Sequence, residues 1–288
     1  MDKILRLGRP LFAVAIIAFG VQHFVWAQYT EATVPIIPFV PANTFLAYLT
    51  GFALLAAGLG IVANAKARLS AILLGFLFLF CVLALQISRV AAHPLDVGVR
   101  TCAFETLALC GSALMLAGTL PAERSYPQPW GNAVNKLIRS GRFLFAGSSV
   151  VFGIDHFLVL GVIVSLVPSW IPGSGLFWAY LTGIGFIAAG LSIATGWMAR
   201  WGGFWLGLMF LLWFVVLHAP RLTSAPRSHN PHEWSSAFIA LAMCGGGWIS
   251  AWALSAKAAS NIADLKRDEQ SGSTDNADIA ARSLRSAV

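Results

Sequence analysis

Long apolar runs separated by short polar segments dominate the chain. Eight such runs approach or exceed the roughly 20 residues that a helix needs to cross a bilayer. They lie at about 9–28, 44–64, 69–91, 99–119, 142–164, 174–197, 201–219 and 235–256. Prolines fall between the runs, as at Pro35 and Pro168, and favour turns there. The pattern predicts an all-α transmembrane protein with eight membrane-spanning helices.

Two stretches of the chain repeat each other. The sequence Gly-Val-Gln-His-Phe at 20–24 recurs as Gly-Ile-Asp-His-Phe at 153–157, and Ala-Tyr-Leu-Thr-Gly at 47–51 recurs at 179–183. Matching positions remain 132 to 134 residues apart. Each copy holds four spans, an even number, so both copies enter the membrane in the same direction. We therefore expect two tandem four-helix bundles related by parallel duplication.

The repeats set the expected domain boundaries. The first repeat covers 1–120 and the second covers 141–256. A linker at 121–140 joins them, and a polar tail at 257–288 has the composition of a disordered segment.

Composition identifies the solvent of this chain. Hydrophobic residues make up 58% of it and charged residues 11%. Soluble domains are nearer to half apolar and about one quarter charged, so a lipid bilayer is the expected surrounding. The net charge of +7 could indicate a nucleic-acid partner. However, the basic residues lie between apolar runs and form no basic patch, so we expect no nucleic acid.

The basic residues also predict an orientation. If the N-terminus is cytoplasmic, 15 of the 19 Lys and Arg residues lie on the cytoplasmic side, which is the usual bias. The four outside are Arg89, Arg100, Arg221 and Arg227. We expect a multi-pass protein of the inner membrane with both termini, the linker and the tail in the cytoplasm. The first run recurs as the fifth span, so we interpret it as a structural helix and not as a signal peptide.

Polar side chains within spans are costly in lipid and therefore mark candidate functional positions. In both repeats they gather toward the outer end, whereas the inner half of each span has almost none. The candidate polar site consists of His23, Gln86, Arg89, His93, Glu105, Asp155, His156, His218 and Arg221. Within the third span, Gln86, Arg89 and His93 follow at i, i+3 and i+7, and this spacing predicts that they share one helix face.

Two interpretations of these polar residues remain open. In the structural one, Arg89 pairs with Glu105 and Arg221 pairs with Asp155, which neutralises charge at the bundle ends. In the functional one, an imidazole beside a carboxylate moves protons or holds a polar head group. Such a pocket would face the outer side of the membrane.

Metal and haem sites are less favoured alternatives. Two pairs of histidines offer axial haem ligands: His156 with His218, and His23 with His93. One group offers zinc ligands: His218, His229, His232 and Glu233. The segment that carries most of that group is first of all a proline-containing loop, so we expect no metal site. The four cysteines lie in apolar runs without a CxxC spacing, and we expect them to be buried.

Small residues indicate close helix packing. Gly203 and Gly207 form a GxxxG motif, which allows two helix backbones to approach in lipid. Packing within each bundle is the favoured interpretation, and a homodimer interface is the alternative.

The four-span unit resembles the DoxX-like superfamily. The resemblance rests on Gly-x-x-His-Phe near the end of the first helix, followed by a proline-rich loop, Tyr-Leu-Thr-Gly and Ala-Ala-Gly-Leu. It covers about 8–119 and 141–256. By position it points to His23, Tyr48, Thr50 and Gly51, and to His156, Tyr180, Thr182 and Gly183. Members of that superfamily include subunits linked to quinone-dependent thiosulfate oxidation and to thiol redox complexes. The tandem form departs from the usual single unit.

Three functions follow as hypotheses. The first is a quinone- or thiol-linked membrane redox component with an outer-leaflet polar site, quinone as its candidate cofactor and a membrane redox subunit as its partner. The second is a non-enzymatic assembly or structural subunit. The third is a transporter of a small molecule or lipid, against which stands the lack of polar residues in the inner half of the spans.

Overall fold

The computed structural model describes residues 1–26, 44–121, 130–224 and 232–255, which contain helices and no strands. Residues Met1–Ala253 form one compact unit. Eight helices in the described residues are long and apolar enough to cross a membrane, which confirms the number of spans predicted from the hydrophobic runs. The predicted tail at 257–288 lies outside the described residues.

Four spans make up the first half of the chain. They comprise α1 (Asp2–Leu5) with α2 (Gly8–Trp26), α3 (Thr44–Val62), α4 (Ala67–Cys81) with the π-helix η1 (Val82–Gln86) and α5 (Ile87–Ala92), and α6 (Val97–Thr119).

Four further spans make up the second half. They comprise α7 (Trp130–Leu158) with the short α8 (Leu160–Leu166), α9 (Gly175–Thr195), α10 (Ala199–Trp213) with η2 (Phe214–His218) and α11 (Ala219–Thr223), and a last helix at His232–Ser255.

The fifth span differs from its prediction at both ends. It was expected at 142–164, but α7 already begins at Trp130, within the segment predicted as a linker. It ends at Leu158 because the backbone at Val159 leaves the helical region, with φ −118° and ψ 41°. The apolar residues that follow form α8 as a separate short helix.

The two halves interlock through close glycine contacts. The first helix of the second half, α7, crosses α6, where a Cβ added to Gly111 would lie 2.6 Å from the carbonyl oxygen of Gly141. The last helix crosses α2 in the same way, since a Cβ added to Gly245 would lie 2.8 Å from the carbonyl oxygen of Gly8. Such distances require glycine and bring the backbones together. Each half therefore packs its final helix against the first helix of the other half.

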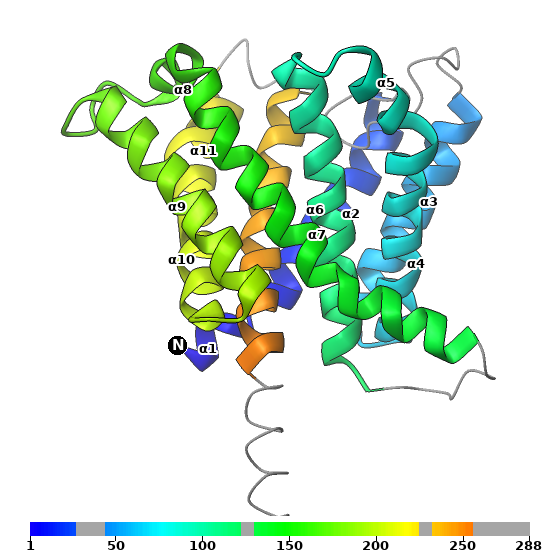
Figure 1. Ribbon diagram of the computed structural model, residues 1–288. Coiled ribbons are helices and arrows are strands. Elements are labelled where there is room, and N and C mark those ends of the chain that lie inside the picture. The colour runs from blue at the N-terminus through cyan, green and yellow to red at the C-terminus, as the bar shows by residue number, and fades with distance from the viewer. Residues whose placement is uncertain (27–43, 122–129, 225–231, 256–288) are drawn as a thin grey trace, which may run out of the picture. The chain divides into compact units, whose positions relative to one another are not determined.

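In Figure 1 this interlocking places α6 and the last helix, drawn in orange, in the middle of the unit. The helices α3 and α4 lie on one side of them, and α9 and α10 lie on the other. These two central helices are also the most buried of the eight candidate spans in the described residues. Side chains held between them and their neighbours are consequently shielded from the surrounding lipid.

Backbone irregularities recur between the halves. The π-helices η1 and η2 each continue directly from the preceding α-helix, and their first residues are 132 positions apart. Lys66 and Met198, also 132 positions apart, both precede an α-helix with left-handed backbone angles, at φ 51° and φ 50°. The same turns and the same interruptions thus occur at equal spacing in both halves.

Basic residues lie mainly at one end of the antiparallel helices, which we call the basic end. It comprises the starts of α2, α4, α7 and α10. The described Lys and Arg residues at this end are Lys3, Arg6, Arg9, Lys66, Arg68, Lys136, Arg139, Arg142 and Arg200. At the opposite end the described basic residues are Arg89, Arg100 and Arg221. This separation is the one expected from the sequence, and the side of the membrane that each end faces remains a prediction.

Candidate functional site

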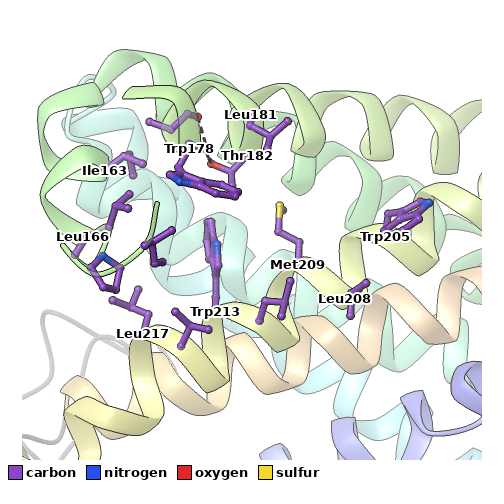
Figure 2. A pocket seen from close by; sticks show the side chains of 16 residues that line it. Ile163, Leu166, Trp178, Leu181, Thr182, Trp205, Leu208, Met209, Trp213 and Leu217 are labelled. Carbon is purple, nitrogen blue, oxygen red and sulfur yellow. Dashed lines mark hydrogen bonds between the residues drawn. The ribbon is translucent and has the colours of Figure 1, made fainter. Parts of the chain in front are cut away.

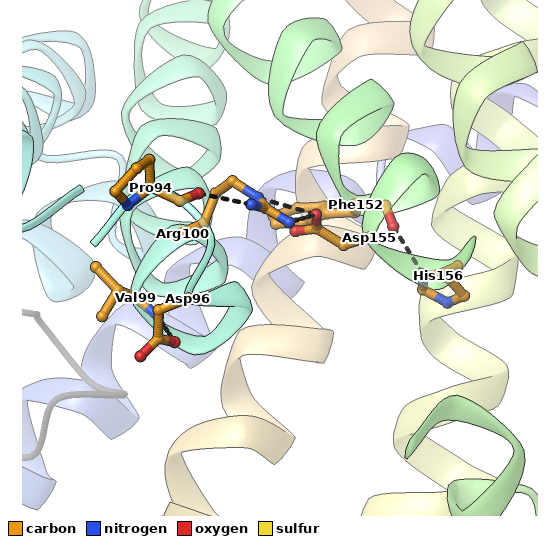
Figure 3. Close-up of polar contacts among 7 residues, drawn as sticks. All are labelled: Pro94, Asp96, Val99, Arg100, Phe152, Asp155 and His156. Carbon is orange, nitrogen blue, oxygen red and sulfur yellow. Dashed lines mark hydrogen bonds and ion pairs between the residues drawn. The ribbon is translucent and has the colours of Figure 1, made fainter. Parts of the chain in front are cut away.

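An ion pair between α6 and α7 holds the only acidic residue of α7. Arg100 Nε donates to Asp155 Oδ1 at 2.9 Å, and its Nη2 contacts the same oxygen. Arg100 Nη1 also donates to the Pro94 carbonyl at 2.9 Å, as Figure 3 shows. The Asp155 side chain is 6% exposed, so this is a nearly buried contact. The predicted pair of Arg221 with Asp155 is therefore wrong.

The start of α6 positions Arg100. Asp96 precedes the helix, and its Oδ1 accepts a hydrogen bond from Val99 N at 3.1 Å. A carboxylate at this position satisfies one of the free backbone donors of the first turn. The cap fixes the first turn of α6, on which Arg100 lies, so the guanidinium is directed toward α7.

The other predicted ion pair is also absent. Arg221 lies 4.0 Å from Glu233, a residue of the last helix. Among the described residues no ion pair joins Arg89 to Glu105. Both residues are half-buried. Charge neutralisation at this end of the helices therefore uses partners other than those that sequence position suggested.

Two neutral polar pairs are buried at the same end of the helices. Ser235 Oγ donates to Gln22 Oε1 at 2.8 Å and joins the last helix to α2. Gln86 Nε2 donates to Thr106 Oγ1 at 3.1 Å and joins η1 to α6. The Gln22 amide nitrogen has no hydrogen-bond partner within the described residues. These pairs connect helices that are distant in sequence.

The polar residues of the third span do not share one buried face. Gln86 is buried at the end of η1, Arg89 is half-buried, and His93 is exposed where α5 ends. The prediction from i, i+3 and i+7 spacing fails because the helix ends at Ala92, so His93 adopts a non-helical conformation. His93 is accordingly not brought near His23 as an axial partner by this helix face.

The two buried histidines have matching contacts within their own helices. His23 Nδ1 lies 2.7 Å from the Phe19 carbonyl, and His156 Nδ1 lies 2.7 Å from the Phe152 carbonyl. A carbonyl only accepts, so Nδ1 carries a proton in both rings. The neutral His156 ring then has an unprotonated Nε2. That atom is buried and has no hydrogen-bond partner among the described residues.

His156 points away from Arg100 (Figure 3), and aromatic side chains contact its ring. The Trp213 ring stacks on the imidazole, with centroids 5.7 Å apart and planes at 16°. Phe186 approaches from α9, with a centroid distance of 5.1 Å. His218, in contrast, lies on η2, and its buried Nδ1 has no partner in the described residues. Asp155 and His156 are adjacent in sequence, but Asp155 contacts Arg100 of α6 whereas His156 contacts aromatic rings of α9 and α10.

An apolar cavity lies beside Trp213. Its volume is about 400 Å³, and α8, α9, α10 and η2 enclose it. Figure 2 shows the indole of Trp213 rising from its helix into the lining, between Leu217 and Met209. Leu181, Trp205 and Leu212 also line it and are 48%, 58% and 53% exposed, so the cavity opens to the lipid-facing surface.

Polar groups in this lining are few and mostly occupied. Trp178 Nε1 donates to the Pro172 carbonyl at 2.9 Å, and Thr182 Oγ1 donates to the Trp178 carbonyl at 2.8 Å. The indole nitrogens of Trp205 and Trp213 make no hydrogen bond to described residues. Both indoles therefore have an N–H group without an acceptor among the described residues.

Sequence reasoning missed this cavity. Its only signal is the stripe of Trp205, Met209 and Trp213 at i, i+4 and i+8 on one helix face. Trp178 of α9 also lines the cavity. The region of the first half that matches α8 falls within residues 27–43, outside the described residues.

The cysteines and the candidate metal ligands contribute no assembled site among the described residues. Cys81, Cys110 and Cys244 are buried, Cys102 is half-buried, and none of the four forms a disulfide. No group of three or more His, Cys, Asp and Glu side chains converges in the described part of the chain. His229 of the zinc alternative lies outside it.

Comparisons of the chain with protein-family models, with curated proteins and with solved structures gave no match.

Proposed function

We propose that this chain is an integral membrane protein built by tandem duplication of a DoxX-like four-span unit, and that its second half binds a lipid-soluble ring compound of the quinone class. Three recurrences support the duplication: the imidazole contacts of His23 and His156, the glycine crossings of the two halves, and the two π-helices. All of them recur at offsets between 132 and 134. In this proposal both termini are cytoplasmic in an inner membrane.

The cavity beside Trp213 carries the proposal for the ligand. Its volume of about 400 Å³ falls within the range of about 300–1,000 Å³ typical of small-molecule sites. Its lining is nearly all apolar, with Trp178, Trp205 and Trp213 as aromatic surfaces. A flat ring stacks on indoles, and its carbonyl oxygens accept hydrogen bonds from indole N–H groups. The opening toward lipid admits a molecule with a long apolar chain.

His156 supports a role for the reduced form of such a ligand. Its Nε2 is an acceptor without a partner among the described residues, and Trp213, which stacks on the imidazole, also lines the cavity. A quinol hydroxyl is a donor and a quinone carbonyl is an acceptor. Indole N–H groups and an unprotonated imidazole therefore provide one group suited to each form.

The thiol-linked alternative has less support. A reactive cysteine needs a thiolate in a polar, accessible place. Three of the four cysteines are buried, and Cys110 Sγ donates to the Gly75 carbonyl at 3.3 Å within the helix packing. The quinone interpretation is therefore the one we retain.

An assembly subunit is the second candidate function. The contacts Arg100–Asp155, Gln22–Ser235 and Gln86–Thr106 each join two helices, and they account for two of the predicted site residues, Gln86 and Asp155, without any ligand. In that case the cavity would be filled by ordinary lipid chains, and the protein would bind no ring compound selectively.

Adjacent residues of η2 offer a matched test. Val216 lines the cavity, whereas Val215 does not and is 55% exposed. Native mass spectrometry of the detergent-purified chain with added ubiquinone should show a bound quinone in the wild type and in Val215→Trp, and its loss in Val216→Trp. Equal quinone binding by both variants would favour the assembly function.

A further inference from the structure

A second site lies at the basic end, beside Arg142. In the first half, Arg9 occupies the position 133 residues earlier and is held within the protein. Its Nε donates to the Ile61 carbonyl at 3.1 Å, and its Nη2 donates to Asn64 Oδ1 at 2.9 Å. Arg9 thereby satisfies the C-terminal end of α3, and much of its hydrogen-bonding capacity is used.

Arg142 lacks the acceptor that Asn64 provides. Gly196 stands 132 residues after Asn64 and has no side chain to accept a hydrogen bond. Arg142 nevertheless reaches this turn, because a Cβ built on Gly196 would lie 4.0 Å from Arg142 Nη1. No hydrogen bond or ion pair joins its guanidinium to a described residue, and the Phe143 ring lies 4.4 Å from its central carbon. The five N–H donors of Arg142 are therefore available.

The surroundings of Arg142 add positive charge and exposed aromatic rings. Arg139 is exposed and precedes Arg142 by three residues on α7. Residues 130–142 and 195–201 contain no acidic residue. Trp197 follows Gly196 and is 75% exposed. Exposed tryptophan beside basic residues is typical of the membrane–water interface.

We propose that Arg142 and Arg139 bind the phosphate of an anionic phospholipid at the basic end of the second half. A guanidinium with free donors binds phosphate oxygens in a bidentate manner. The basic end of a membrane protein also faces the leaflet that is richest in anionic lipid. Since the cavity lies toward the opposite end of α9 and α10, this site is independent of quinone binding.

Two reciprocal substitutions test the site. Gly196→Asn gives Arg142 the acceptor that Arg9 has, and Asn64→Gly removes that acceptor from Arg9. The backbone tolerates both changes, because Asn64 and Gly196 both have positive φ, 56° and 87°, and asparagine adopts this region readily. The charge of the protein is the same in both variants, so the exchange changes only the availability of a guanidinium.

The measurement is native mass spectrometry of the full chain titrated with phosphatidylglycerol or with phosphatidylcholine of the same acyl chains. The wild type should hold one phosphatidylglycerol preferentially. Gly196→Asn and Arg142→Gln should weaken that binding about tenfold, as expected for losing one hydrogen bond to a charged group. Asn64→Gly frees one donor of Arg9, which keeps its contact with the Ile61 carbonyl, so it should add weaker binding of a second phosphatidylglycerol, and misfolding does not produce such a gain.

Two results would overturn this proposal. One is equal phosphatidylglycerol binding by the wild type, Gly196→Asn and Arg142→Gln. The other is displacement of the bound lipid by millimolar inorganic phosphate, which would assign the site to small anions and not to a phospholipid.

Discussion

Trp213 lies against the imidazole of His156, with ring centroids 5.7 Å apart and planes at 16°, while it also lines the apolar cavity. Trp213 is thus a wall residue of the cavity that also contacts the histidine. It therefore links the cavity wall directly to the imidazole.

Removing the indole donor should weaken quinone binding. Trp213→Phe keeps an aromatic ring against His156 but loses the N–H group, and a net hydrogen bond of about 1 kcal/mol corresponds to a loss of affinity of about fivefold. Quenching of protein fluorescence by added ubiquinone measures the affinity. Trp234→Phe is the control, because Trp234 stacks on Phe238 and does not line the cavity. Unchanged affinity in Trp213→Phe would show that the indole N–H group of Trp213 does not bind the quinone.

Breaking the ion pair between α6 and α7 should destabilise the protein. Asp155→Asn leaves the Arg100 guanidinium, 16% exposed, without its counter-charge, at a cost of about 3 kcal/mol in the free energy of unfolding. The double variant Arg100→Gln with Asp155→Asn should recover most of that loss. Denaturant unfolding in mixed micelles provides the measurement.

The control for this prediction is a surface ion pair of the same type. Arg200 pairs with Asp2, and their side chains are 40% and 63% exposed. Arg200→Gln should change the unfolding free energy by less than about 1 kcal/mol. If Asp155→Asn had an equally small effect, the contact between Arg100 and Asp155 would not hold the two helices together.

Replacing a glycine at a helix crossing should destabilise the protein, whereas replacing a glycine on the open surface should not. Gly111→Ala places a methyl group 2.6 Å from the Gly141 carbonyl oxygen and should cost about 1–3 kcal/mol of stability. Gly147→Ala has nothing within 4 Å and should be neutral, or stabilising by about 0.5–1 kcal/mol, because alanine favours the helix. Thermal unfolding in detergent compares the two. Similar losses in both variants would contradict the close approach of α6 and α7.

Cysteine labelling tests the predicted orientation. Leu95 lies in the turn before α6 and is 89% exposed, whereas Asn64 lies in an exposed turn at the basic end. In intact cells, a membrane-impermeant maleimide should label Leu95→Cys and leave Asn64→Cys unlabelled, with the native cysteines as background. The reverse pattern would place the basic end outside.

The hydrophobic runs predicted the spans because, in lipid, each helix must form all its backbone hydrogen bonds within itself, whatever helices it packs against. The gathering of polar residues toward one end was also evident from their position along each run. Partners were harder to predict. Arg100 and Arg221 both lie at the same end of the helices as Asp155, so sequence position did not decide between them. The crossing of α6 and α7 at Gly111 and Gly141 places Arg100 beside Asp155.

The cavity was beyond prediction from pattern alone. Its α8 wall follows the break at Val159, which lies between two leucines; no proline marks the break, and Gly161 follows only two residues later. The cavity also depends on Trp213 packing against His156 across two helices, a contact set by how those helices rotate against each other. The sequence predicted a site made of all the outer polar residues, whereas the structure supports a site at the aromatic residues around His156.

Photocrosslinking with an azido-ubiquinone analogue tests the central claim most directly. After illumination and peptide mapping of the full chain in nanodiscs, crosslinks should concentrate in the cavity lining of α9 and α10, and excess ubiquinone should abolish them. Crosslinks spread over lipid-exposed residues such as Phe80 and Leu83, or insensitive to excess ubiquinone, would contradict a quinone site in this protein.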